Sequence, residues 1–236
     1  MAAAFARGWT GRWEGMLFFD PDSDRARKLA GELGGEVVGS NAELAERADV
    51  VVLAVKPGAL ERAAGELGGA KSVVSILGAT PLESVQAAFP NAEVGRVMPN
   101  VAVEVGSGVL CVAGRFGSEV REKLGALGSV VELPDSQFDV ATAVMACSPA
   151  YFALVAEALA EAGVSAGLDG ELAEKLVVGA AAGTGSLMQV RHPADLRISV
   201  TSPGGSTEAG LDALEREGAR AAFQAAVRAS LERMRG

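Results

Sequence analysis

The sequence is poor in the residues that build metal sites, disulfide frameworks and nucleic-acid surfaces. It has two cysteines, Cys111 and Cys147, and one histidine, His192, which excludes a cysteine–histidine zinc site and a disulfide framework. The 30 acidic residues outnumber the 21 basic ones, so nucleic acid is not an expected partner. Such sparse cysteine is typical of a reducing compartment, and we expect a cytoplasmic protein.

Long apolar runs are also absent, and no basic segment precedes an apolar one at the start of the chain. The sequence therefore predicts neither a membrane span nor a signal peptide. Aromatic residues make up 5% and hydrophobic residues 49% of the 236 residues. We expect a globular protein with a core built mainly from Ala, Val and Leu.

Short apolar runs alternate with helical patterns over the first two-thirds of the chain. Many of the runs are β-branched and bounded by Gly, Pro or Asp, which favours buried strands over buried helices. The alternation predicts an α/β fold with a mostly parallel sheet built from βαβ units. Strands are expected at residues 16–20, 36–38, 49–55, 72–77, 93–97, 109–113 and 130–133.

The chain changes character from Ser136 onward, where no strand pattern occurs. Residues 177–185 are small and apolar nearly all round, as in a helix that is buried or faces a partner subunit. The sequence predicts two domains, residues 1–134 and 135–236, that meet near Pro134, and we expect the second to dimerise. Helices are expected there at residues 141–146, 149–166, 170–190 and 216–235.

One expected element is missing at the start. A dinucleotide-binding fold normally begins with a strand, a G-x-G-x-x-G turn and a helix, whereas residues 1–9 (MAAAFARGW) resemble the middle of that helix. The first strand is central in such a sheet, and each buried backbone group left unpaired costs roughly 1–3 kcal/mol. The chain could start upstream, could have lost cofactor binding, or could have a sheet rearranged around the gap.

The segment VTSPGGST at residues 200–207 is the richest in possible chemistry. Its two glycines let the backbone approach a ligand closely. Hydroxyls and backbone N–H groups at a helix N-terminus form an anion site suited to a carboxylate. A helix-capping loop explains the same residues equally well.

This segment and four others occur in the order seen in pyrroline-5-carboxylate reductases, and the chain resembles that family over nearly its whole length. Met1 resembles the methionine that follows the family's glycine-rich turn. The resemblance implies a Rossmann-like sheet, here without its first strand, followed by an all-helical dimerisation domain. The other segments are AVKP at residues 54–57, RVMPN at 96–100, SPAY at 148–151 and HPA at 192–194.

The resemblance implies an enzyme that reduces the C=N bond of 1-pyrroline-5-carboxylate to give proline, with NADPH or NADH. It also implies a homodimer or higher oligomer. Thr207 matches the hydroxyl that the family uses as proton donor or relay, and positioning would supply most of the catalysis. The residues implied to line the cofactor are Ala54, Val55, Lys56, Pro57, Met98, Pro99 and Asn100. Those implied to hold the substrate are Ser202, Gly204, Gly205, Ser206 and Thr207.

Single residues allow more than one role. Asp20 ends a predicted strand, where an acid would bind the adenosine ribose and favour NADH, but it could instead cap the next helix. Arg25 could meet a 2′-phosphate. Lys56 is either a surface lysine or, at the carboxyl end of a strand, a ligand contact. We expect structural roles for His192 and Cys147.

Several positions depart from the family pattern near the expected active site. Val101-Ala102 replace T-P, Ala146 and Ser148 replace two glycines, Ile198 replaces an acid and Glu208 replaces an apolar residue. A reductase of a different imine and a dimeric paralogue without dinucleotide binding are therefore alternatives. A β-hydroxyacid dehydrogenase is disfavoured, because residues 145–149 lack its G-x-x-G-x-G pattern.

Overall fold

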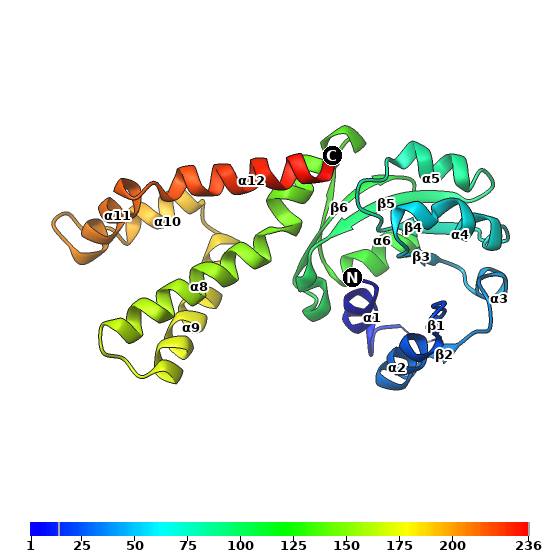
Figure 1. Ribbon diagram of the computed structural model, residues 1–236, viewed down its shortest axis with the longest axis horizontal. Coiled ribbons are helices and arrows are strands. Elements are labelled where there is room, and N and C mark those ends of the chain that lie inside the picture. Colours follow the sequence, from blue (N-terminus) through cyan, green and yellow to red (C-terminus); the bar gives the residue numbers. More distant parts are fainter. Residues whose placement is uncertain (14, 236) are drawn as a thin grey trace. The chain divides into compact units, whose positions relative to one another are not determined.

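The computed structural model describes residues 1–13 and 15–235 and divides into two compact units (Figure 1). The first unit consists of Met1–Cys147 together with the end of the chain from Leu231, and the second is Ser148–Ser230. The main sheet belongs to the first unit, and helices make up the second. The predicted fold class, a mostly parallel sheet followed by an all-helical region, is confirmed.

The main sheet has five strands in the order β3-β4-β5-β6-β7. Neighbouring strands run parallel except β5 and β6, which are antiparallel. Because β3, β4 and β5 are parallel, their carboxyl ends meet at one edge. The bounds are Val51–Leu53 for β3, Ser72–Ser75 for β4, Glu93–Pro99 for β5, Gly108–Gly114 for β6 and Gly128–Glu132 for β7.

Strands β1 (Leu17–Phe18) and β2 (Glu36–Val37) form a separate parallel pair (Figure 1). Within the described residues, β1 pairs only with β2, and β3 pairs with β4 on one edge only. The strand order of a Rossmann sheet would place one strand between β1 and β3, and the sheet divides at that place. Within the described residues, no other strand fills that place, and the two sheets remain separate.

Helices cover both faces of the main sheet. On one face Leu53, Val73 and Val85 belong to a core cluster with residues of the helices that follow β2, β3 and β4. On the other face Phe5 and Leu124 pack with Val97. The helix bounds are Ala2–Trp9 for α1, Ser23–Leu33 for α2, Asn41–Arg47 for α3, Leu60–Glu66 for α4, Leu82–Ala88 for α5 and Ser118–Gly125 for α6.

Helix α1 is anchored at both its polar and its apolar face. Phe5 is fully buried and meets the Trp9 ring edge-on at 5.3 Å between centroids. The Trp9 indole N–H donates to the carbonyl of Lys123 at 2.7 Å. Arg7 Nε donates to Glu32 Oε1 at 2.6 Å, and this hydrogen bond lowers the pKa of the Glu32 carboxyl. The expected first-unit helix at the chain start is thus present.

The substitution Gly8→Ala should destabilise the first unit by about 1–3 kcal/mol, because it overpacks a tight contact. A Cβ at Gly8 would lie 2.2 Å from the carbonyl oxygen of Val103 and 2.5 Å from Leu127 Cδ2. Urea unfolding followed by tryptophan fluorescence measures the change. Gly31→Ala in α2 is the matched control: nothing lies within 4 Å of its added Cβ, so it should stabilise by about 0.5–1 kcal/mol. Equal stability of the two variants would contradict this packing.

The residues that follow β7 pack with the first unit. Phe138, in helix α7 (Phe138–Ala141), is fully buried with Met98 and Cys111. A stretch of π-helix, Thr142–Ala146, continues from α7, and Ala146 packs on the same cluster. The compact division therefore falls after Cys147, later in the chain than the predicted boundary near Pro134.

The described residues of the second unit form helices and turns without a strand. Asp169 caps α9 by accepting from the N–H groups of Glu171 and Leu172. The helix predicted over residues 216–235 begins later, because Gly218 has φ +78° and separates α11 from α12. The bounds are Ser148–Ser165 for α8, Gly170–Met188 for α9, Pro193–Ser199 for α10, Ser206–Arg216 for α11 and Ala219–Arg235 for α12.

Large apolar side chains of the second unit remain exposed in this single chain. Phe152, Leu154 and Leu159 on α8 are 67%, 63% and 56% exposed, and no residue of α8 is fully buried. By length and composition alone, Asp135–Ser165 could cross a membrane, although the sequence predicts no membrane span. Core helices of soluble proteins meet the same criteria, whereas an exposed apolar patch of this kind marks an interaction surface.

Candidate functional site

The predicted cofactor residues of two strands lie at the carboxyl edge of the main sheet. Ala54, Val55 and Lys56 follow β3 directly, and Pro57 begins a 3-10 turn. Met98 and Pro99 end β5, and Asn100 follows. Open α/β sheets bind ligands at this edge. The structure thus brings together two segments that are more than forty positions apart in the sequence.

The two segments differ in what they offer a ligand. Ala54, Lys56 and Pro57 are exposed, so the chain is accessible immediately after β3. Met98 is only 8% exposed and packs against Cys111 and Phe138. The Asn100 side-chain oxygen accepts from the Val109 N–H at 3.2 Å. The first segment is therefore suited to direct contact, and the second forms the floor of the edge.

Between these segments lies a loop that the sequence did not single out. Residues 76–81 connect β4 to α5. Ala79 has φ +49°, the only non-glycine with positive φ among the residues the structure describes. Such strain is often found at ligand-binding loops. Thr80 is buried and donates to the carbonyl of Gly78 at 3.0 Å. The glycine after a buried strand was the one sequence signal that could have found this loop.

Asp20 is half-buried just beyond the carboxyl end of β1. Its Oδ1 accepts from the Asp22 N–H at 2.8 Å. Asp22, and not Asp20, caps α2, since its side chain accepts from the Asp24 N–H. Arg25, the alternative contact for a 2′-phosphate, is paired with Asp22 at 3.1 Å. The capping role considered for Asp20 is therefore wrong.

The predicted substrate residues lie in the second unit, where a tight turn precedes α11. The Gly205 N–H donates to the carbonyl of Ser202 at 2.9 Å and closes this turn. Gly204 has φ +72°, and a Cβ on Gly205 would lie 2.9 Å from the Ser202 carbonyl oxygen. Both positions therefore require glycine. Glu208 Oε2 accepts from the Gly204 N–H at 2.7 Å and holds the turn against the helix.

The start of α11 leaves several donors open. Gly205 is the N-cap and has no side chain to cap the first turn. The first N–H groups of a helix lack intrahelical acceptors and carry partial positive charge. Ser202, Ser206 and Thr207 are exposed beside them. This arrangement can bind a carboxylate, and the Thr207 hydroxyl lies within the same segment.

The other chemically active residues have structural surroundings. His192 Nδ1 accepts from the Ala194 N–H at 3.3 Å at the start of α10. Cys111 is buried in β6, and burial raises the pKa of its thiol. Cys147 is half-buried. Within the described residues, no group of three or more His, Cys, Asp or Glu side chains could hold a metal ion.

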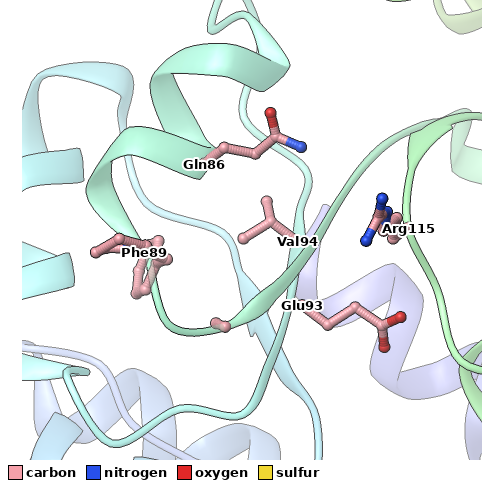
Figure 2. A pocket seen from close by; sticks show the side chains of 7 residues that line it. Gln86, Phe89, Glu93, Val94 and Arg115 are labelled. Carbon is pink, nitrogen blue, oxygen red and sulfur yellow. The ribbon is translucent and has the colours of Figure 1, made fainter.

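A hollow of about 460 Å³ lies in the first unit, away from the predicted residues. Gln86, Phe89, Glu93, Val94 and Arg115 contribute to its lining (Figure 2). Glu93 begins β5, so the hollow is at the amino end of that strand, opposite the carboxyl edge. Its lining includes one acidic residue, Glu93, and one basic residue, Arg115. The Glu93 carboxylate accepts from the Gly117 N–H at 3.1 Å.

Two family models match the chain. Residues 135–236 match a model described as pyrroline-5-carboxylate reductase dimerisation. Residues 1–78 match one described as NADP oxidoreductase, coenzyme F420-dependent. The oxidoreductase model thus matches the start of the chain and the dimerisation model its later part.

Curated relatives extend over most of the chain. Pyrroline-5-carboxylate reductase of Synechocystis is 37% identical over 231 residues, covering 93% of this chain and 86% of the relative. The reductase of Thermus thermophilus is 36% identical over 219 residues, covering 89% and 83%.

Solved structures agree with these relatives. Pyrroline carboxylate reductase of Plasmodium falciparum with NADP bound has a TM-score of 0.85 at 26% identity, covering 98% of this chain and 92% of that one. The enzyme of Streptococcus pyogenes has a TM-score of 0.88 at 26% identity, with coverages of 99% and 94%. The chain belongs to the pyrroline-5-carboxylate reductase family.

Proposed function

We propose that the chain reduces 1-pyrroline-5-carboxylate to proline, with NADPH or NADH as the hydride source. The observation that carries the proposal is the arrangement of the carboxyl edge. Exposed residues after β3, the strained loop after β4 and the end of β5 meet there. The relatives named above, which carry this activity in their names, support the same reaction.

The residues at the carboxyl edge fit the nicotinamide half of a dinucleotide. Ala54 and Lys56 are exposed, and Met98 gives the edge an apolar floor. The bound cofactor supplies a hydride for the imine carbon. In this proposal Ala54, Val55, Lys56 and Pro57 line the cofactor, together with Met98, Pro99 and Asn100. Asp20 accepts from the ribose hydroxyls, which favours NADH.

The turn before α11 holds the substrate in this proposal. The open N–H groups of the first helical turn and the hydroxyls of Ser202 and Ser206 bind its carboxylate, while Gly204 and Gly205 allow close approach. The Thr207 hydroxyl orients the protonated imine nitrogen or relays its proton. A threonine hydroxyl is a weak acid, so orientation supplies most of its effect.

We infer that the exposed apolar side chains of α8 and α9 are covered by a second copy of the chain. Leu176 and Val178 on α9, like the three residues of α8, are more than half exposed. The dimerisation model matches this region. We place this homodimer or higher oligomer in the cytoplasm, where reducing conditions agree with the two free cysteines.

A dimeric paralogue without dinucleotide binding is the second candidate. The observations that favour it are the departures from the family pattern at Ala146, Ser148 and Ile198, near the expected active site. This paralogue would keep the apolar helical surface and lose the hydride transfer.

Cofactor oxidation by the 236-residue chain separates the two candidates. We expect NADPH or NADH to be oxidised only when 1-pyrroline-5-carboxylate is present, with proline as product. Running both cofactors in parallel tests the role of Asp20, because its carboxylate should disfavour a 2′-phosphate. A chain that dimerises and yet oxidises neither cofactor would contradict the reductase and favour the paralogue.

A further inference from the structure

A single charged residue is fully buried in the part of the chain that the structure describes. Arg96 on β5 is 3% exposed, and the other buried polar residues are the neutral Ser75 and Thr80. Arg96 precedes Met98 by two positions on the same strand, so both side chains lie on one face of the sheet.

The Arg96 guanidinium joins β5 to two other segments. Its Nη1 donates to Asp135 Oδ1 at 2.8 Å, and the second oxygen of Asp135 accepts from the Leu82 N–H at 3.0 Å. The guanidinium carbon lies 4.4 Å from the centre of the Phe138 ring. Asp135 thus connects β5 with the first residue of α5 and with the segment that leads into α7.

Stability alone gives a poor reason for this pair. Arg96 Nε is buried and has no hydrogen-bond partner among the described residues, and an unsatisfied buried donor costs free energy. The Arg96 side chain is 4% exposed and that of Asp135 is 29% exposed, and an ion pair with a buried partner is often no more stable than well-packed apolar side chains of similar volume. The ion pair can instead fix the positions of the segments that it contacts. Its value then depends on which segments those are.

The ion pair of Arg96 with Asp135 contacts two segments of the carboxyl edge, the loop after β4 and the end of β5. Leu82 directly follows the loop that contains Ala79, so its bond to Asp135 anchors the end of that strained loop. Met98 packs against Phe138, which the Arg96 guanidinium covers. Movement of Arg96 or Asp135 would therefore displace the loop after β4 and the floor formed by β5 together.

We propose that Arg96 and Asp135 are positioning residues that fix the loop after β4 and Met98 for hydride transfer. The inference rests on the proposed reductase function. Neither side chain touches the substrate in this role. They act through Leu82 and Phe138, and the guanidinium must keep its two-sided contact with a carboxylate and a ring.

The double variant Arg96→Met/Asp135→Leu tests the pair without leaving a buried charge unpaired. We expect the KM for the cofactor to rise on the order of tenfold and kcat to fall, since small misplacements slow the chemical step. The primary deuterium isotope effect on kcat, measured with deuterated cofactor, should increase because hydride transfer becomes more rate-limiting. Arg96→Lys, which keeps the ion pair, should recover part of the activity.

The control is Arg121→Met, which breaks the exposed pair of Arg121 with Glu132 in the same unit and should leave both readouts unchanged. A merely structural role would reduce the active fraction and leave the KM and the isotope effect at wild-type values. If the wild-type chain is active and the double variant keeps the wild-type KM and isotope effect, the positioning role is overturned and the proposed function is not. A wild-type chain that oxidises neither cofactor overturns the proposed function, and the positioning role with it.

Discussion

A chain extended ahead of Met1 by an apolar strand and a glycine-rich turn should bind NADPH about a hundredfold more tightly, or about 2.7 kcal/mol at 1.4 kcal/mol per factor of ten. The reason is the division of the sheet between β1 and β3, whose facing edges have no partner strand within the described residues. An inserted parallel strand would pair with both. It would also place the turn directly before α1, whose N-terminus could then hold the diphosphate.

Isothermal titration with NADPH measures this difference on the 236-residue and extended chains. The matched control carries an extension of equal length made of glycine and serine. This extension adds the same number of residues but is not expected to form a strand. We expect the control to bind as weakly as the unextended chain. Equal affinity of the strand-bearing chain and the control would show that the open edges of β1 and β3 do not limit binding.

Thr207→Ala should lower kcat about a hundredfold, the lower range for losing a positioned proton-transfer group. Thr207 is exposed, and the N-cap of its helix is Gly205, with no side-chain capping hydrogen bond. The substitution should therefore cost little stability. Initial rates with saturating cofactor and imine measure the effect, and urea unfolding checks the fold. Thr207→Ser keeps the hydroxyl and should retain most of the turnover.

Thr10→Ala is the control for losing a threonine hydroxyl. The Thr10 hydroxyl donates to the carbonyl of Ala6, one turn earlier in the same helix-containing segment. We expect its removal to leave kcat unchanged. Wild-type turnover in Thr207→Ala would remove this residue from the proposed mechanism.

The strands could be predicted because burial on both faces leaves a clear pattern. The β-branched run at residues 49–55 predicted a strand, and β3 occupies its centre, Val51–Leu53. The strand is shorter than the run because, among the described residues, only one edge of β3 has a partner strand to hydrogen-bond. The pattern of apolar residues indicates burial. The length of a strand also depends on its neighbouring strands, which its own sequence does not identify.

The turn before α11 was predictable from two adjacent glycines, since their backbone requirements are local. The loop after β4 and the ion pair of Arg96 with Asp135 were not. Arg96 and Asp135 are 39 positions apart, and an arginine in an apolar strand gives no indication of its partner. Glu208 was expected only as a departure from the family, and its bond to Gly204 explains how the turn accommodates it.

The order of synthesis has a consequence for the first unit, because its residues come from both ends of the chain. Residues 148–230 form the second unit, and the chain from Leu231 is counted with the first. The helical unit is thus an insertion in the sheet-bearing unit, tethered at two points. During translation the chain therefore returns to the first unit, at Leu231, only after the whole helical unit, Ser148–Ser230, has been made.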